Sequence, residues 1–352
     1  MEVDCCHGAV EKDGETSLVW LKISTFADAM DFRTVVQLPQ ASFSLTPSSH
    51  IVMLGSCFAE YIGEKLEAAL PDGTASVNPY GVLYNPESIR RVLCELFFEQ
   101  APNDELLCFK GNNGLWHHWL FSSVASADSQ AACLALVEER RKVAKAVCAQ
   151  ADVLMVTFSS DHVYRLRSEE LVGLTVANCH KEPAALFEEK VLDVEQEFGE
   201  WDMLLKRLAH LRPGLKVVFT LSPYRYLKYG LMESQMGKAR LLYLIGKLQV
   251  HNPNVQYFPA YEIVVDELRD YRFYDRDMLH PSAQAVDYIW ERFQAWCFSS
   301  ELVVYSKEKQ ALHRFLSHRP HCPNSEVAQQ HFAECEQRKK DFATKWEPYI
   351  TR

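Results

Sequence analysis

Two short motifs carry side chains that could together cleave or transfer an acyl group. Ser56 and Cys57 follow the apolar run 51–54 and precede a helical pattern, which places a nucleophile at a strand-to-helix turn. Far along the chain, Asp277 and His280 supply a carboxylate and an imidazole. A nucleophile, a base and an acid that orients the base are what a hydrolase requires. The sequence therefore predicts an enzyme.

The turn after the first apolar run favours nucleophilic chemistry for electrostatic reasons. Backbone N–H groups and the positive end of a helix macrodipole stabilise a thiolate or an oxyanion there. Ser56 and Cys57 both qualify as the nucleophile. A plain tight turn, with a capping serine and a buried cysteine, is the simpler interpretation of the same residues.

The spacing of Asp277 and His280 on a loop lets the carboxylate orient the imidazole while the imidazole faces the nucleophile. A surface acid and a loop histidine before Pro281 are the alternative. The placement favours the acid-base pair, because the motif lies between the last predicted strand and a helix that Ser282 should cap and that should end near Cys297.

An alternation of short apolar runs and helical patterns must position these side chains. The predicted buried strands are residues 51–54, about 74–77, 153–158, 216–221 and 255–258. The predicted helices are residues 59–70, 86–99, 128–149, 184–210 and 235–249. Right-handed crossovers then give a doubly wound α/β sheet of five parallel strands, with ligands beyond the carboxyl ends of the strands.

Three regions are expected along the chain. Residues 1–29 are polar and acidic and form an N-terminal extension, residues 30–297 form the α/β domain, and residues 298–352 form a helical C-terminal extension. A Pro-rich break at 319–323 should divide that last region.

Composition excludes several classes of protein. The 352-residue chain is 48% hydrophobic and can bury a large core, but its net charge of -10 argues against nucleic-acid binding. No stretch approaches the roughly 20 apolar residues of a membrane span, and the N-terminus has no leader pattern. Eleven cysteines without C-x-x-C pairs fit reduced thiols. These features predict a cytoplasmic protein with neither nucleic-acid nor membrane partners.

No metal or cofactor is expected. His117 and His118, and the separate group His318, His321 and Cys322, lack the paired spacing of a zinc site. The chain also has no Walker loop and no G-x-G-x-x-G motif for a nucleotide.

Several motifs together resemble those of the GSCFA domain family. They occur in order over about residues 30–297, and they are residues 53–60 (MLGSCFAE), 78–86 (NPYGVLYNP), 178–181 (NCHK), 222–225 (SPYR) and 277–282 (DMLHPS). That family looks like a branch of the SGNH, or GDSL-like, hydrolases. The resemblance implies a flavodoxin-like three-layer α/β/α sandwich and esterase-type chemistry.

The resemblance also assigns roles to single residues. An ungapped match to the G-D-S motif places Cys57 at the nucleophile and Ser56 at the aspartate, whereas a shift of one residue would select Ser56. Cys57 is preferred because a thiolate is intrinsically the stronger nucleophile and a helix N-terminus should lower the thiol pKa. By the same plan His280 is the base and Asp277 its orienting acid.

The oxyanion donors are less well matched. Gly81 resembles the donor glycine, and Asn178 could supply the side-chain amide, although a cap or turn role for Asn178 is equally compatible. Where the family resembles Gly-Thr-Ala-Trp, this chain has Ser159 through His162, with Asp161 inside. Loss of that glycine puts the turn in doubt, and a carboxylate would repel an oxyanion.

Three further residues could bind substrate. His180 and Lys181 could contact the substrate or its oxyanion, or form a surface loop, while Cys179 beside His180 is a poor dyad because sequence neighbours seldom face each other. Arg225 could bind a substrate anion or form a structural salt bridge.

The sequence thus predicts a cofactor-free ester hydrolase acting on a small-molecule or glycan acyl ester. The expectation of a carbohydrate substrate rests on analogy with the superfamily alone. Acyl transfer to another acceptor and a non-catalytic binding module are the alternatives.

Overall fold

The computed structural model describes residues 33–98, 102–319 and 325–350. The chain divides into two units, residues 1–34 and 35–352, and the description below concerns the second. The predicted extension at residues 1–29 lies outside the described residues.

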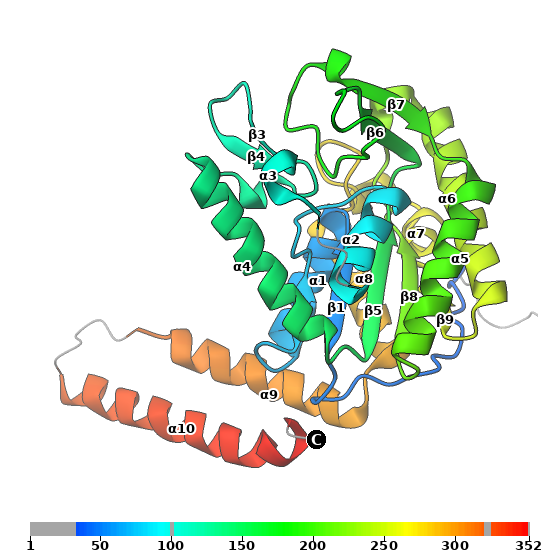
Figure 1. The fold of residues 1–352 in the computed structure, drawn as a ribbon. Coiled ribbons are helices and arrows are strands. Elements are labelled where there is room, and N and C mark those ends of the chain that lie inside the picture. The colour runs from blue at the N-terminus through cyan, green and yellow to red at the C-terminus, as the bar shows by residue number, and fades with distance from the viewer. Residues whose placement is uncertain (1–32, 99–101, 320–324, 351–352) are drawn as a thin grey trace, which may run out of the picture. The chain divides into compact units, whose positions relative to one another are not determined.

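A five-stranded parallel sheet forms the centre of this unit (Figure 1). Its strands are β1 (Ile51–Gly55), β2 (Ala75–Val77), β5 (Val153–Phe158), β8 (Lys216–Leu221) and β9 (Val255–Tyr257). They are ordered β2-β1-β5-β8-β9, and every pair is parallel. The predicted strands and the flavodoxin-like sheet are confirmed. Because β2 and β5 lie on opposite sides of β1, the strand order reverses beside β1, where ligands bind in such sheets.

Helices cover both faces of this sheet, which confirms the three-layer sandwich. The main helices are α1 (Cys57–Ala69), α2 (Pro86–Phe98), α4 (Gln130–Cys148), α5 (Val194–Leu211), α6 (Leu231–His251) and α8 (Ala283–Cys297). Side chains of a strand alternate between faces. Thus Val52 and Leu54 pack with α2, α4, α5 and α6, whereas Ile51 and Met53 pack with α1 and α8. Ser282 caps α8 through its Oγ and the Ala285 N–H (3.3 Å), as predicted.

The long helix predicted over residues 184–210 is wrong in its first part. Residues Phe187–Val191 form β7, which pairs antiparallel with β6 (His162–Leu166), and α5 begins only at Val194. The Asp193 carboxylate caps α5 by accepting the N–H groups of Glu195 and Gln196 (2.9 and 3.1 Å). Pairing with a distant strand and this cap together override the local helical pattern.

Several short elements were not predicted. They are α3 (Asp104–Leu107), β3 (Cys108–Lys110), β4 (Trp116–His118), α7 (Ala260–Glu262), the π-helix Ile263–Glu267 and the 3₁₀ turns Ser123–Ala125, Ala184–Leu186, Leu227–Tyr229 and Tyr271–Phe273. Strands β3 and β4 form a second antiparallel hairpin.

The C-terminal region is helical, as predicted, and contributes α9 (Ser300–Ser317) and α10 (Glu326–Ile350). The Lys309 ammonium on α9 donates to the carbonyls of Glu67 and Leu70 at the end of α1. Helix α10 returns along α9, where the Trp346 indole donates to Glu308 (2.9 Å) (Figure 1). Helix α9 therefore packs on α1, and α10 packs on α9.

The packing of α1 on β2 depends on one glycine. A Cβ at Gly63 would lie 2.3 Å from Cγ1 of Val77. We expect Gly63→Ala to lower the free energy of unfolding by about 1–3 kcal/mol, because a close-packed interface must move apart. Gly199→Ala on α5 is the matched control, since nothing lies within 4 Å of its added Cβ. It should stabilise by up to about 1 kcal/mol. Urea unfolding of both variants measures the difference, and equal stabilities would contradict the packing argument.

Candidate active site

The turn between β1 and α1 exposes a thiol and buries a hydroxyl. Ser56 precedes α1 and is fully buried, and its Oγ has no hydrogen-bond partner and does not cap the helix. Cys57 is the first residue of α1 and is only partly buried. A substrate arriving at this end of the sheet would therefore meet the sulfur first.

Neighbouring segments fix this turn through the backbone of Gly55. The Gly55 N–H donates to Oδ1 of Asn78 (2.8 Å), and the Gly55 carbonyl accepts the Leu83 N–H (2.8 Å). A Cβ at Gly55 would lie 2.6 Å from Cβ of Thr157 on β5. The glycine thus lets β1 and β5 end close together at the point where the strand order reverses.

The Cys57 thiol was expected to have a lowered pKa because it lies at a helix N-terminus, but its pKa is raised overall. Burial raises the pKa of this thiol, and the Glu60 carboxylate raises it further. The N–H groups of Phe58 and Cys57 and the charge of Lys238 act in the opposite direction but are outweighed. A thiol in this environment needs a base to take its proton at neutral pH.

The side chain of Lys238 lies buried at the carboxyl ends of β5 and β8. Its Nζ on α6 donates to the carbonyls of Ser159 and Ser222, both at 2.8 Å. Burial lowers the pKa of Lys238 to about 7, and the charges of Asp161 and Cys57 oppose this shift. The amine therefore links the ends of β5 and β8, and it lies near enough to Cys57 to affect the ionisation of the thiol.

The departures from the family motif after β5 fit this arrangement. Asp161 is buried but paired, because its carboxylate accepts from Arg240 Nη1 (2.7 Å) and contacts Nδ1 of His162 (3.0 Å). The negative charge of Asp161 is thus compensated, and Arg240 holds the carboxylate toward α6. Ser159 is not among the described residues with positive φ, so the turn does not require glycine there.

Asp277 holds His280 as the spacing suggested. The Asp277 carboxylate contacts Nδ1 of His280 (2.5 Å) through one oxygen and accepts the N–H groups of Leu279 and His280 (2.8 and 3.0 Å) through the other. These bonds lower the pKa of Asp277 to about 2. The carboxylate stays ionised at neutral pH and directs the other ring nitrogen, Nε2, away from itself.

The loop after β8 contacts the acid-base loop. Arg225 donates its N–H to the Leu279 carbonyl (3.0 Å) and its Nη1 to the Met278 carbonyl (3.1 Å). The Tyr224 ring lies 4.4 Å from the His280 ring, centroid to centroid. Burial raises the pKa of Tyr224, and the charges of Asp277 and Cys57 add to the effect. Tyr224 is therefore near both halves of the predicted site.

The two predicted oxyanion donors are placed differently. The Gly81 N–H donates to the Asn78 carbonyl (2.7 Å), so this donor is already engaged within a turn. Gly81 is needed for a positive φ of 74° and because a Cβ would lie 1.8 Å from Oγ of Ser122. The Asn178 Oδ1 accepts the His180 N–H (2.7 Å), and Asn178 lines a cavity of about 370 Å³.

His180 and Lys181 follow Asn178 in a turn where both have positive φ (49° and 60°). His180 is buried, contacts the Phe121 carbonyl through Nε2 (3.0 Å) and stacks on His117, with ring centroids 4.5 Å apart. Burial lowers the pKa of His180 to about 4. Its ring is committed to packing, whereas Lys181 is exposed.

Lys238 is the residue of this region that the sequence-based interpretation missed. A signal was available, because Lys238 precedes Leu241 by three residues and Ile245 by seven, on the apolar side of α6. A lysine in that stripe predicts a buried amine with a specific partner.

Metal-binding groups are not apparent in the part of the chain that the structure describes. No three His, Cys, Asp or Glu side chains there are arranged to hold an ion. His118 contacts Asp104 (3.1 Å) and His117 contacts Ser126 (2.6 Å), while residues 320–324 lie outside the description. All described cysteines are free thiols. None of the helices described is both long and apolar enough to span a membrane.

Comparison with known proteins adds one match. The model of the GSCFA family matches residues 50–293, a span that contains Cys57, Lys238, Asp277 and His280. A search of curated proteins finds no significant match to the chain.

Proposed function

This chain belongs to the GSCFA family, and from that premise we propose that it hydrolyses carboxylic esters with Cys57 as the nucleophile. The observation that carries the proposal is the contact of the Asp277 carboxylate with Nδ1 of His280, which orients a base, and the partly accessible thiol of Cys57 at the N-terminus of α1 would supply the nucleophile. Tyr224 lies near both. This combination supports acyl chemistry more directly than the fold does, because one fold hosts many functions.

The first half of the reaction forms a thioester. His280 takes the Cys57 proton through Nε2 as the sulfur attacks the ester carbonyl carbon, and the carbon–sulfur bond forms. The N–H groups at the start of α1 and the Asn178 amide would stabilise the oxyanion. Collapse breaks the carbon–oxygen bond, and His280 returns its proton to the departing alcohol.

The second half of the reaction releases the acid. Water attacks the thioester carbon and gives one proton to His280, and the carbon–sulfur bond then breaks. The leaving thiolate recovers that proton, and the carboxylic acid departs. Throughout, Asp277 holds the tautomer of His280 and stabilises its charged form. Acyl transfer would differ only in replacing water by another hydroxyl.

Hydrolysis of p-nitrophenyl acetate tests the proposal. We expect His280→Ala to lower kcat/KM by about 10²–10⁴, the usual contribution of a general base. His210→Ala is the control, because that histidine is exposed at the end of α5. Measurable turnover by the wild type and the control, but not by His280→Ala, is the expected result. Turnover unchanged by His280→Ala would contradict the role of that histidine, whereas no turnover at all would favour the non-catalytic binding module.

A further inference from the structure

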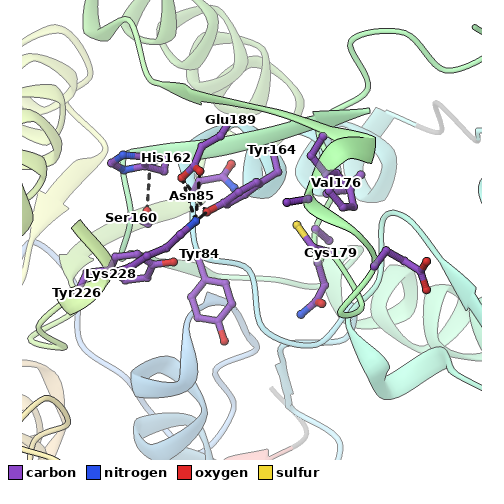
Figure 2. Close-up of a pocket in the computed structure, with 15 residues that line it drawn as sticks. Tyr84, Asn85, Ser160, His162, Tyr164, Val176, Cys179, Glu189, Tyr226 and Lys228 are labelled. Atoms are coloured by element: carbon purple, nitrogen blue, oxygen red, sulfur yellow. Dashed lines mark hydrogen bonds and ion pairs between the residues drawn. The ribbon is translucent and has the colours of Figure 1, made fainter. Parts of the chain in front are cut away.

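A cavity of about 370 Å³ lies between the β6–β7 hairpin and the loops after β2 and β8. Figure 2 shows its residues. Its lining is aromatic on several sides, with Tyr84, Tyr164 and Tyr226, and it also carries polar groups such as those of Ser160, Asn178 and Lys228. This volume and mixture are typical of a small-molecule site.

Tyr84 connects this cavity with the nucleophile turn. It follows Leu83, whose N–H donates to the Gly55 carbonyl (2.8 Å), and its own carbonyl accepts the N–H groups of Ser159 and Ser160 (3.0 and 2.8 Å). Burial raises the pKa of Tyr84 to about 12, and the nearby charge of Cys57 contributes to the shift. The side chain points from the cavity toward α1 in Figure 2. An ester held at Cys57 could therefore extend past Tyr84 into the cavity.

The charges in this cavity disfavour an anionic ligand. Lys228 is the only lysine or arginine among its lining residues, and its Nζ lies 3.2 Å from both carboxylate oxygens of Glu189 (Figure 2). Glu182 adds a second carboxylate. With its cation paired and a carboxylate in excess, the cavity would repel phosphate, sulfate or carboxylate groups.

A cationic ligand is also disfavoured at Tyr164, because Lys228 already occupies the face of that ring. Its Nζ lies 4.8 Å from the ring centroids of both Tyr164 and Tyr229. An ammonium group that used the Tyr164 face would be placed beside the Lys228 charge. The remaining class is a neutral molecule that has an apolar face for the rings and hydroxyl groups for the polar side chains.

We propose that this cavity binds the alcohol part of the ester substrate and that this part is an uncharged carbohydrate ring. The proposal rests on the function proposed above. The C–H face of a sugar would pack on Tyr84 and Tyr226, while one of its hydroxyls would bond to Ser160. The acyl group would then lie at Cys57.

Binding is tested without turnover in the full-length Cys57→Ala variant. Saturation-transfer NMR is recorded with millimolar methyl glycosides of several neutral hexoses, with glucose 6-phosphate and with choline. At least one neutral glycoside should bind, and the two charged probes should not. Ala184→Trp, placed at an exposed residue that lines the cavity, should remove the signal. Ala185→Trp is the matched control, because Ala185 is also exposed and is adjacent in sequence but does not line the cavity.

A kinetic measurement separates this proposal from the function on which it rests. In the enzyme with Cys57 intact, Ala184→Trp should raise KM for an acetylated glycoside at least tenfold and leave the rate of Cys57 alkylation by iodoacetamide nearly unchanged. If the wild type does not hydrolyse p-nitrophenyl acetate, the proposed esterase function is overturned, but the proposal of glycoside binding is not. No glycoside signal, a signal unaffected by Ala184→Trp, or preferred binding of either charged probe would overturn the carbohydrate site.

Discussion

Cys57→Ala is expected to lower the kcat of ester hydrolysis by at least about 10⁴, because removal of a nucleophile leaves only the contributions of binding and of the oxyanion donors. Ser56→Ala should retain activity within a few-fold. Its hydroxyl is fully buried, has no partner and does not cap α1, so a substrate cannot reach it. Steady-state hydrolysis of p-nitrophenyl acetate by the two variants measures the difference.

Thiol labelling provides the control for this comparison. Iodoacetamide should modify Cys57 in the wild type and in Ser56→Ala, and peptide mass spectrometry would identify the site. The Ser56→Ala variant should also be at least as stable as the wild type, because it removes an unpaired buried hydroxyl. Full activity in Cys57→Ala together with an inactive but folded Ser56→Ala would select the serine as nucleophile.

Lys238→Met is expected to change how stability depends on pH. The folded pKa of Lys238 is about 7, below its ordinary value of 10.5. Between these values the unfolded chain binds the proton more tightly, so the contribution of Lys238 to the free energy of unfolding rises with pH, by at most about 1.4 kcal/mol per pH unit. The difference between wild type and Lys238→Met should therefore increase from pH 7 toward pH 10.

Urea unfolding at several pH values measures this difference. At neutral pH the variant should already be less stable, because the Ser159 and Ser222 carbonyls lose their donor, at a cost of about 1–3 kcal/mol each. Lys142→Met, at an exposed position of α4, is the control and should show no such trend. A wild-type minus variant difference that is constant over this pH range would contradict a lowered pKa for Lys238.

Lys238→Met also tests the link between the buried amine and the nucleophile. The positive charge of Lys238 lowers the pKa of Cys57 in part. Near pH 7, where the Lys238 amine is still partly protonated, the variant should be alkylated at Cys57 more slowly than the wild type, and the difference should disappear toward pH 10, where the amine is neutral. A purely structural lysine would give a difference that does not depend on pH.

The sequence by itself determined the sheet, because its three central strands, β1, β5 and β8, are short apolar runs buried on both faces. It also determined the Asp277–His280 contact. That geometry spans three residues of one loop, so spacing alone largely fixes it. The helix start at Ser282 was predictable for the same reason, since a cap is a local interaction.

Only the tertiary structure decided which atoms face the site. Ser56 and Cys57 are adjacent in sequence, and their different burial depends on how α1 packs against the sheet. Likewise, β7 replaced a predicted helix because its partner β6 lies more than 20 residues away in sequence. The engaged N–H of Gly81 and the carbonyl partners of Lys238 also depend on the folded arrangement. Local patterns specify elements, whereas burial, pairing and charge depend on segments that only the fold brings together.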